Sequence, residues 1–237
     1  IVQRFAREVL GTKNIDFQRH VIEGDEDKIL IRADKTPNSR GAIEVGVHPG
    51  ENGLGLGGIL RGINEGTIKA LYLVDETVAA DPAVAQLLAR LEFLVVHSAV
   101  ETEATRQADV LLPASTYAEK NGTFTNFQGR VQRIRPSVAT IDQDRSLDGF
   151  AMSRLDKFGS SFDRWARGPR RDARPTWKII AGIASLMGAK FRYQTAEDVF
   201  NDIALRVGAY KGMSYRAIGN RGMLLKSAKD ARVSVTV

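Results

Sequence analysis

The residues best suited to chemistry begin with a glycine-rich segment. Gly53, Gly55 and Gly58 satisfy the pattern G-x-G-x-x-G, and Asp75 ends the next apolar run, where a dinucleotide-binding fingerprint has its ribose-binding acid. That fingerprint requires a strand that runs directly into the first glycine, whereas residues 48–52 intervene here. We therefore favour a flexible glycine loop over a nucleotide site at this position.

The histidines do not form a metal site. His20, His48 and His97 lie on separate segments, and none has a second histidine three or four residues away, as a helical metal site would. His97 follows the apolar run 93–96, at the carboxy end of a predicted parallel strand, where ligands of open α/β folds bind. A loop histidine with a local hydrogen bond is the simpler alternative.

The remaining reactive side chains do not indicate a hydrolase. Ser98, Ser115 and Thr116 lack the G-x-S-x-G elbow, and no base and orienting acid accompany them. Lys120 precedes Asn121 and a glycine, and is either a charged contact in a binding loop or part of a solvated turn. The sequence has no cysteine, which excludes disulfides, thiolate nucleophiles, zinc-thiolate sites and cysteine-ligated iron-sulfur clusters from this chain.

The elements that must position these residues alternate between apolar runs and helices. The run 68–75 is followed by a helix that Asp81 caps, and the runs 93–96 and 110–112 are separated by a short helix. Continuous apolar runs joined by crossover helices are typical of a parallel sheet that is covered on both faces. The predicted fold class is α/β, an open and mostly parallel sheet with helices on both faces, plus a smaller β-hairpin and a helical carboxy-terminal portion.

Other segments complete the predicted organisation. We expect a strand at 42–47, a helix at 57–64, a hairpin formed by 124–126 and 131–134, and two helices, 176–187 and one capped by Thr195, buried against the sheet. The predicted domains are an α/β domain over 1–145, a basic insertion or loop over 146–174, and a helical closing segment with a basic tail over 175–237, packed on the same domain.

Charge is distributed unevenly along the chain. Residues 1–150 carry 17 basic and 21 acidic groups, whereas residues 151–237 carry 17 basic and 7 acidic groups. A basic half of this size could face nucleic acid, an anionic membrane surface or an acidic protein partner. Because aromatic RNA-binding motifs are missing, nucleic acid is not expected, and we favour acidic protein neighbours. No run approaches the roughly 18 apolar residues of a membrane span, so direct insertion into a membrane is not expected. The chain opens at Ile1 within a helical pattern, which suggests a fragment.

One long segment resembles a known family. The stretch 101–134, ETEATRQADVLLPASTYAEKNGTFTNFQGRVQRI, resembles the segment shared by molybdopterin oxidoreductases, with an acid-Thr-acid-Ala entry, ADVLLPA, EKNGTFTN and GRVQR. Residues 38–49 and 68–75 resemble the preceding portion of that family, and residues 173–177 and 196–204 resemble its closing portion. The likeness therefore covers most of residues 38–205.

Among these relatives, the chain looks most like the carboxy-terminal region of the large iron-sulfur subunit of bacterial NADH-quinone oxidoreductase, respiratory complex I. The resemblance implies a non-catalytic scaffold of the peripheral electron-transfer arm, with no cofactor in this chain and iron-sulfur clusters in an absent amino-terminal part. It implies other subunits of a respiratory complex as partners, and a peripheral location on the cytoplasmic face of the bacterial inner membrane. The alternative is a fragment of an active molybdopterin guanine dinucleotide oxidoreductase similar to formate dehydrogenase.

The resemblance also implies where a pterin nucleotide would bind. Members that carry one contact it from the carboxy edge of the sheet and the loops that follow, and the matching residues here are Asp75, His97, Ser98, Thr102 and Asp109. No catalytic or metal-binding residue is expected. The Gly-Glu-Asn-Pro typical after the first strand is replaced by Asp-Glu-Thr-Val, which adds an acid where a phosphate would lie. A third hypothesis, a free-standing nucleotide-binding module, predicts that NADH or a mononucleotide raises the melting temperature.

Overall fold

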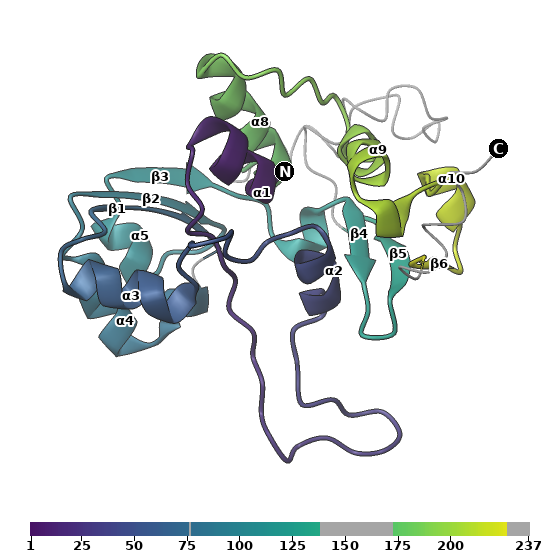
Figure 1. Ribbon diagram of the computed structural model, residues 1–237, viewed down its shortest axis with the longest axis horizontal. Helices are drawn as coiled ribbons and strands as arrows, with labels where there is room; N and C mark the ends of the chain where they lie inside the picture. Colours follow the sequence, from purple (N-terminus) through teal and green to yellow (C-terminus); the bar gives the residue numbers. More distant parts are fainter. Residues whose placement is uncertain (76, 138–172, 227–237) are drawn as a thin grey trace, which may run out of the picture. The chain divides into compact units, whose positions relative to one another are not determined.

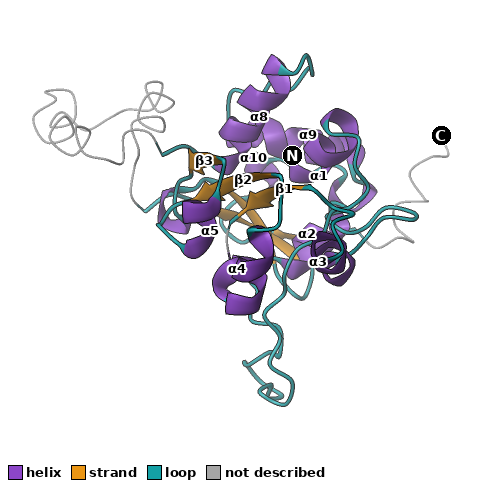
Figure 2. Ribbon diagram, turned by 90° about the vertical axis from the view of Figure 1, so that its left-hand side faces the viewer, coloured by secondary structure: helices purple, strands orange, loops and turns teal. Residues whose placement is uncertain are grey.

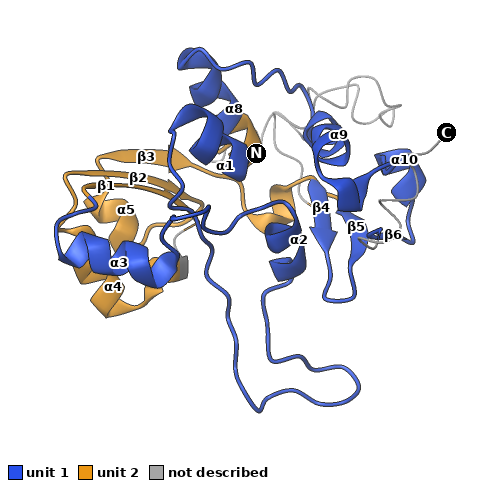
Figure 3. Ribbon diagram, in the orientation of Figure 1, with its two compact units in different colours: residues 1–68, 122–134, 180–237 blue, residues 69–121, 135–179 orange. Residues whose placement is uncertain are grey.

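The computed structural model describes residues 1–75, 77–137 and 173–226. The chain divides into two compact units, drawn in different colours in Figure 3. Unit 1 comprises residues 1–68, 122–134 and 180–237, and unit 2 comprises residues 69–121 and 135–179. The domain division at 145 and 174 stays a prediction, because most of the expected basic insertion lies outside the described residues.

Unit 2 is built on a sheet of three parallel strands in the order β1-β2-β3 (Figure 1). The strands are β1 (Ala70–Val74), β2 (Phe93–Ser98) and β3 (Val110–Pro113). Val96 on β2 is in register with Leu73 on β1 and with Leu111 on β3. The predicted parallel sheet is therefore confirmed, and its central strand runs two residues further than the apolar run indicated.

Crossover segments join these strands and cover one face of the sheet. A 3-10 turn (Thr77–Ala80) and α4 (Pro82–Leu88) connect β1 to β2, and α5 (Glu103–Gln107) connects β2 to β3 (Figure 2). Asp81 caps α4 as predicted, because its carboxylate accepts the Ala83 amide at 2.9 Å. Apolar side chains from the 3-10 turn, both α-helices and two strands form the core of this unit: Leu73, Ala79, Leu88, Leu94, Val96 and Ala104.

Unit 1 contains the predicted hairpin. Strands β4 (Gly122–Thr125) and β5 (Arg130–Ile134) pair antiparallel, and the turn between them contains Gly129 at a φ of 81°, a conformation that favours glycine. A short strand β6 (Met223–Leu224) adds to the free edge of β5. Sequence patterns did not predict β6, because two residues are too short to show a strand periodicity.

The carboxy-terminal helices agree with the predicted bounds, but α9 does not pack where it was predicted to. Helix α8 spans Thr176–Leu186 and α9 spans Ala196–Arg206, with Thr195 as its cap. Phe200 on α9 packs with Val131 of the antiparallel sheet, whereas the prediction placed both helices against the parallel sheet. Leu186 and Leu205 are almost fully exposed. The segment after α9 forms a 3-10 turn (Gly208–Tyr210) and α10 (Tyr215–Ile218).

The predicted strand at 42–47 is wrong, because the structure has helix α2 (Ser39–Glu44) there. Apolar alternation over so few residues does not distinguish a strand from one helical face, and an ion pair between Arg40 and Glu44 at 2.7 Å favours the helix. The predicted helix at 57–64 is confirmed as α3 (Leu56–Asn64). The chain begins with α1 (Val2–Arg4) and a π-helical turn (Phe5–Val9).

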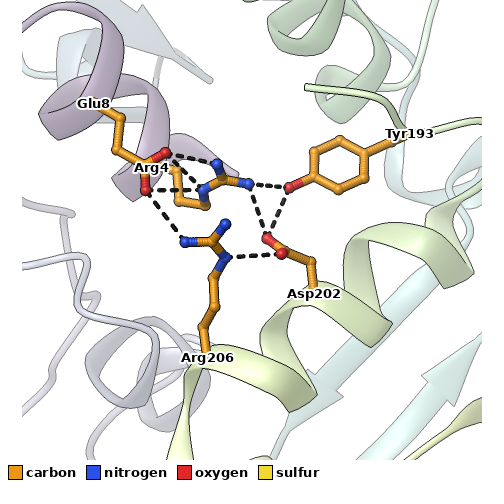
Figure 4. Close-up of polar contacts among 5 residues, drawn as sticks. All are labelled: Arg4, Glu8, Tyr193, Asp202 and Arg206. Carbon is orange, nitrogen blue, oxygen red and sulfur yellow. Dashed lines mark hydrogen bonds and ion pairs between the residues drawn. The ribbon is translucent and has the colours of Figure 1, made fainter. Parts of the chain in front are cut away.

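An ion-pair network joins the first helix of unit 1 to α9 (Figure 4). The Arg4 guanidinium pairs with Glu8 at 2.6 Å and with Asp202 at 2.9 Å, and it also donates to the Tyr193 hydroxyl. Asp202 accepts hydrogen bonds from Tyr193 at 2.7 Å and from Arg206 at 2.8 Å. Segments that are nearly 200 residues apart in sequence are therefore held together by charge.

Between the first turn and α2, unit 1 extends a long loop, drawn in dark purple in Figure 1. Val21 and Asp34 pair across it in an isolated antiparallel bridge. At its tip the Asp27 carboxylate accepts the amides of three consecutive residues, 29–31, and these backbone hydrogen bonds lower the pKa of Asp27. Local hydrogen bonds thus give this exposed loop a defined turn.

Candidate functional site

The carboxy ends of β1, β2 and β3 bring several predicted site residues to one edge of the parallel sheet. Asp75 directly follows β1, and its amide donates to the His97 carbonyl at 3.1 Å. Ser98 ends β2, and its carbonyl accepts the amide of Ala114, which follows β3. Asp75 has a φ of 68°, so the chain turns sharply as it leaves β1. This edge is where open α/β sheets bind ligands.

His97 lies within β2, not in the loop after it as the sequence suggested. Its side chain is only 1% exposed, and its Nε2 atom is 2.6 Å from the hydroxyl of Tyr72 on β1. The two rings are tilted, with centroids 5.1 Å apart. The Nδ1 atom of His97 is buried and has no hydrogen-bond partner among the described residues. A buried polar nitrogen in this state is uncommon, because it loses its bond to water without replacement.

Burial and a nearby cation keep this imidazole neutral. Loss of solvent, and to a smaller extent the positive charge of Lys120, together lower the pKa of His97 to about 4. Burial also raises the pKa of the Tyr72 hydroxyl well above its usual value. Both rings are therefore uncharged at neutral pH, and the phenol keeps its proton.

Two other predicted residues use their hydroxyls within the protein. The Ser98 hydroxyl donates to the Val100 carbonyl at 2.6 Å and accepts the Val100 amide at 3.1 Å. The Thr102 hydroxyl accepts the amide of Thr105 at 3.4 Å, and the Thr105 hydroxyl accepts the amide of Thr102 at 2.8 Å, so the two form a capping box. Ser98 and Thr102 therefore shape the loop that leads from β2 to α5.

Asp109 does not join the other predicted residues. It precedes β3, and it exchanges two hydrogen bonds with Leu94 near the start of β2. The Leu94 amide donates to its carboxylate at 2.7 Å, and its own amide donates to the Leu94 carbonyl at 2.9 Å. In a parallel sheet, the residue before a strand lies at the opposite edge from the residue after it. Asp109 therefore fixes the amino edge of the sheet.

The structure adds Ser115 and Lys120 to the carboxy edge. Ser115 is 1% exposed, its amide donates to the Arg174 carbonyl at 3.0 Å, and its hydroxyl has no partner among the described residues. Lys120 is partly buried and follows a 3-10 turn (Tyr117–Glu119) in which the Glu119 carboxylate accepts the Thr116 amide at 2.8 Å. The sequence analysis considered Ser115 as a nucleophile and Lys120 as a contact in a binding loop or part of a solvated turn, but it did not place either residue at this edge.

The glycine-rich segment belongs to unit 1 and has a structural role there. A side chain at Gly53 would place its Cβ 2.3 Å from the Lys13 carbonyl, so the backbones approach too closely for any other residue. The first amide of α3, that of Leu56, donates to the Asp16 carboxylate at 2.7 Å. An acid therefore occupies the position that a phosphate would take at this helix, in agreement with the glycine-loop interpretation.

The described residues contain neither a cluster of metal ligands nor a helix that could span a membrane. Across residues 1–75, 77–137 and 173–226, no group of three or more His, Cys, Asp and Glu side chains could hold a metal ion. Within the same ranges, no helix combines the length and the apolar character that crossing a membrane requires.

Comparison with known proteins identifies the family. The sequence pattern of molybdopterin oxidoreductases matches residues 4–147, which is more than half of the chain. This chain belongs to the molybdopterin oxidoreductase family. The match includes all of the parallel sheet, the Tyr72 and His97 pair, and the hairpin of unit 1.

Several relatives are named as formate dehydrogenases. The chain is 34% identical over 166 residues to F420-dependent formate dehydrogenase 2 subunit alpha of Methanococcus maripaludis, covering 66% of this chain and 20% of that protein. It is 31% identical over 180 residues to a putative formate dehydrogenase of Bacillus subtilis, covering 74% and 15%. It is 31% identical over 166 residues to NADPH-Fe(3+) oxidoreductase subunit alpha of Geobacter sulfurreducens, covering 68% and 16%.

These relatives are several times longer than the chain. The chain spans a fifth or less of the length of each curated relative that it matches. The predicted family is confirmed by this comparison. The finer prediction, the large subunit of complex I, is not matched by these names, which agree better with the alternative of a formate dehydrogenase-like oxidoreductase.

Proposed function

We propose that this chain is part of the alpha subunit of a molybdopterin-dependent oxidoreductase of the formate dehydrogenase type. Membership of the molybdopterin oxidoreductase family supports this proposal, and so do the names of the relatives from Methanococcus and Bacillus. The same similarities favour it over a cofactor-free scaffold in complex I. Because the relatives are several times longer, the reaction itself belongs to the whole polypeptide.

Within that subunit, we propose that the carboxy edge of the parallel sheet binds the nucleotide end of the pterin cofactor. The observation that carries this proposal is a buried imidazole nitrogen and a buried hydroxyl, on His97 and Ser115, that have no partner among the described residues. Lys120 adds a positive charge close enough to lower the pKa of His97. Donors beside a cation suit an anionic ligand rich in acceptor oxygens, such as a nucleotide diphosphate.

The predicted set of five residues divides into different roles under this proposal. His97 holds the ligand directly, while Ser98 and Thr102 order the adjoining loop through their own hydrogen bonds. Asp75 lies at the same edge, and the Glu76 that follows it lies outside the described residues. When bound, the cofactor supplies the redox chemistry through its metal, and this chain supplies binding and orientation.

We also propose that the whole subunit works with a second subunit. Two of the relatives are named as alpha subunits, which supports a multi-subunit enzyme. An acidic neighbour would complement the basic excess of residues 151–237. A respiratory complex at a membrane face remains the finer prediction from the sequence.

Metal and nucleotide analysis of the full-length polypeptide tests the proposed function. We expect stoichiometric molybdenum or tungsten in the purified subunit, and a guanine nucleotide released by acid. Lys120→Met should lower the nucleotide content severalfold, because it removes the cation at the carboxy edge. Lys69→Met is the matched control, since Lys69 precedes β1, is exposed and pairs only with Glu92 among the described residues. A purified subunit that holds neither metal nor nucleotide would overturn the proposal.

A further inference from the structure

The Tyr72 and His97 pair has a feature that simple packing does not explain. Tyr72 is in register with Val95, two residues before His97, so both rings lie on the same face of the sheet. The 2.6 Å contact satisfies Nε2 of the imidazole, and the buried Nδ1 has no hydrogen-bond partner among the residues that the structure describes. The contact therefore commits Nε2 to the protein and leaves Nδ1 for a partner from outside the described residues, such as a bound ligand.

We propose that Tyr72 is a positioning residue, which fixes His97 in the neutral tautomer whose Nδ1–H donates to an acceptor oxygen of the bound nucleotide. This inference rests on the proposed function, and it adds to it the residue that sets the direction of the hydrogen bond. A phosphate oxygen and a guanine carbonyl share the required acceptor chemistry.

The position of the proton follows from the two partners. A phenol is a stronger hydrogen-bond donor than a neutral imidazole N–H, and an imidazole nitrogen is a stronger acceptor than a phenolic oxygen. In the Tyr72–His97 contact the hydroxyl therefore donates to Nε2. A neutral imidazole carries one proton, so that proton must sit on Nδ1. Which nitrogen is protonated is thus determined by the hydrogen bond at the other one.

The surroundings favour a neutral donor at this position. Lys120 is the neighbouring charge that acts on His97, and its positive charge disfavours imidazolium. The same charge attracts an anionic ligand, and the buried N–H would then find its missing acceptor on that ligand. Tyr72 itself stays within the protein, so its effect on the ligand acts only through His97.

The composition of the chain makes the tautomer directly measurable. The sequence has three histidines, of which His20 and His48 are exposed and His97 is buried. In a long-range ¹H–¹⁵N spectrum of the 237-residue chain, we expect the His97 imidazole to be neutral with its proton on Nδ1. A ligand-free His97 with its proton on Nε2 would overturn the inference.

Titrations with three separate ligands identify the atom that accepts the hydrogen bond from Nδ1. GDP, inorganic pyrophosphate and guanosine are added separately at millimolar concentration while the His97 signals are followed. A shift with GDP and pyrophosphate identifies a phosphate oxygen, and a shift with GDP and guanosine alone identifies the base carbonyl; both support the inference. No shift with any of the three means that only a buried water satisfies Nδ1, and that result refutes the donor role.

Variants separate positioning from simple packing. Tyr72→Phe removes the hydroxyl that fixes the tautomer of His97. It should weaken GDP binding by roughly five- to tenfold, the effect of one lost hydrogen bond. Tyr117→Phe is the control, because the Tyr117 side chain is exposed, and it should change nothing. His97→Asn places an amide donor where Nδ1 was and should keep most of the affinity, whereas His97→Gln places it toward Tyr72 and should not. Equal losses in both His97 variants would refute the directional role.

The failure of this inference is distinguishable from the failure of the proposed function. If the full-length subunit contains metal and nucleotide but His97 carries its proton on Nε2, the proposed function stands and the role of Tyr72 is wrong. If the subunit lacks both, the proposed function fails whatever tautomer His97 adopts.

Discussion

The pairing of Arg4 with Asp202 should contribute more to stability than an ordinary surface ion pair. The Arg4 side chain is 15% exposed and that of Asp202 is 21% exposed, so water screens their attraction only partly. Burial alone would raise the pKa of Asp202, but hydrogen bonds from Arg206 and Tyr193 and the charge of Arg4 lower it overall. The Arg4 guanidinium also lies 4.4 Å from the centre of the Phe191 ring. The network therefore combines charge, hydrogen bonds and stacking.

The size of the effect lies between two known limits. Exposed ion pairs contribute up to about 1 kcal/mol, and loss of one partner from a fully buried pair costs about 3–5 kcal/mol. For a pair that is mostly but not fully buried, we expect Asp202→Asn to lower the free energy of unfolding by about 2 kcal/mol. In a chain of this length, that loss corresponds to a decrease of about 4–8 °C in the melting temperature.

A double-mutant cycle isolates the pairwise part of this effect. Urea unfolding of Arg4→Met, Asp202→Asn and the double variant should give a coupling energy of about 1.5 kcal/mol. The control cycle uses Lys69 and Glu92, an ion pair of similar length (2.7 Å) whose side chains are 64% and 67% exposed; its coupling should stay below about 0.5 kcal/mol. Equal coupling in the two cycles would show that burial of the network adds nothing, and would refute the reasoning.

Two further predictions concern acid stability and backbone packing. Because folding lowers the pKa of His97 to about 4, the unfolded chain binds a proton at this residue first as the pH falls below 6.5. The free energy of unfolding should therefore be unaffected above pH 6.5 and should decrease by about 2–3 kcal/mol toward pH 4. Urea titrations at several pH values should show that His97→Asn removes this loss and that His48→Asn does not. Gly222→Ala should destabilise the chain by about 2 kcal/mol or more, because Gly222 has a φ of 74° and an added Cβ would lie 2.6 Å from the Val131 carbonyl. Gly57 has open space around it, so Gly57→Ala should be neutral or slightly stabilising in thermal melts. The reverse order of the two effects would contradict the assigned backbone geometry.

The sequence by itself determined the features that depend on neighbouring residues. The caps of α4 and α9, the turn at Gly129 and the parallel direction of β1, β2 and β3 follow from local hydrogen bonding and from apolar runs, and the structure has all of them. The motif in residues 101–134 indicated the family for the same reason, since a continuous segment carries its pattern within itself. The strand predicted at 42–47 failed where the pattern was short enough to fit a helix.

Tertiary structure decided which chemical groups meet. Strand register, which no local pattern specifies, placed Tyr72 beside His97, and the direction of β3 placed Asp109 at the opposite edge. The Arg4–Asp202 pair also depended on the completed fold, because 198 residues separate its members. Hydrogen-bond partners and burial are properties of the folded chain, so no sequence pattern indicated that Nδ1 of His97 is buried and has no partner among the described residues.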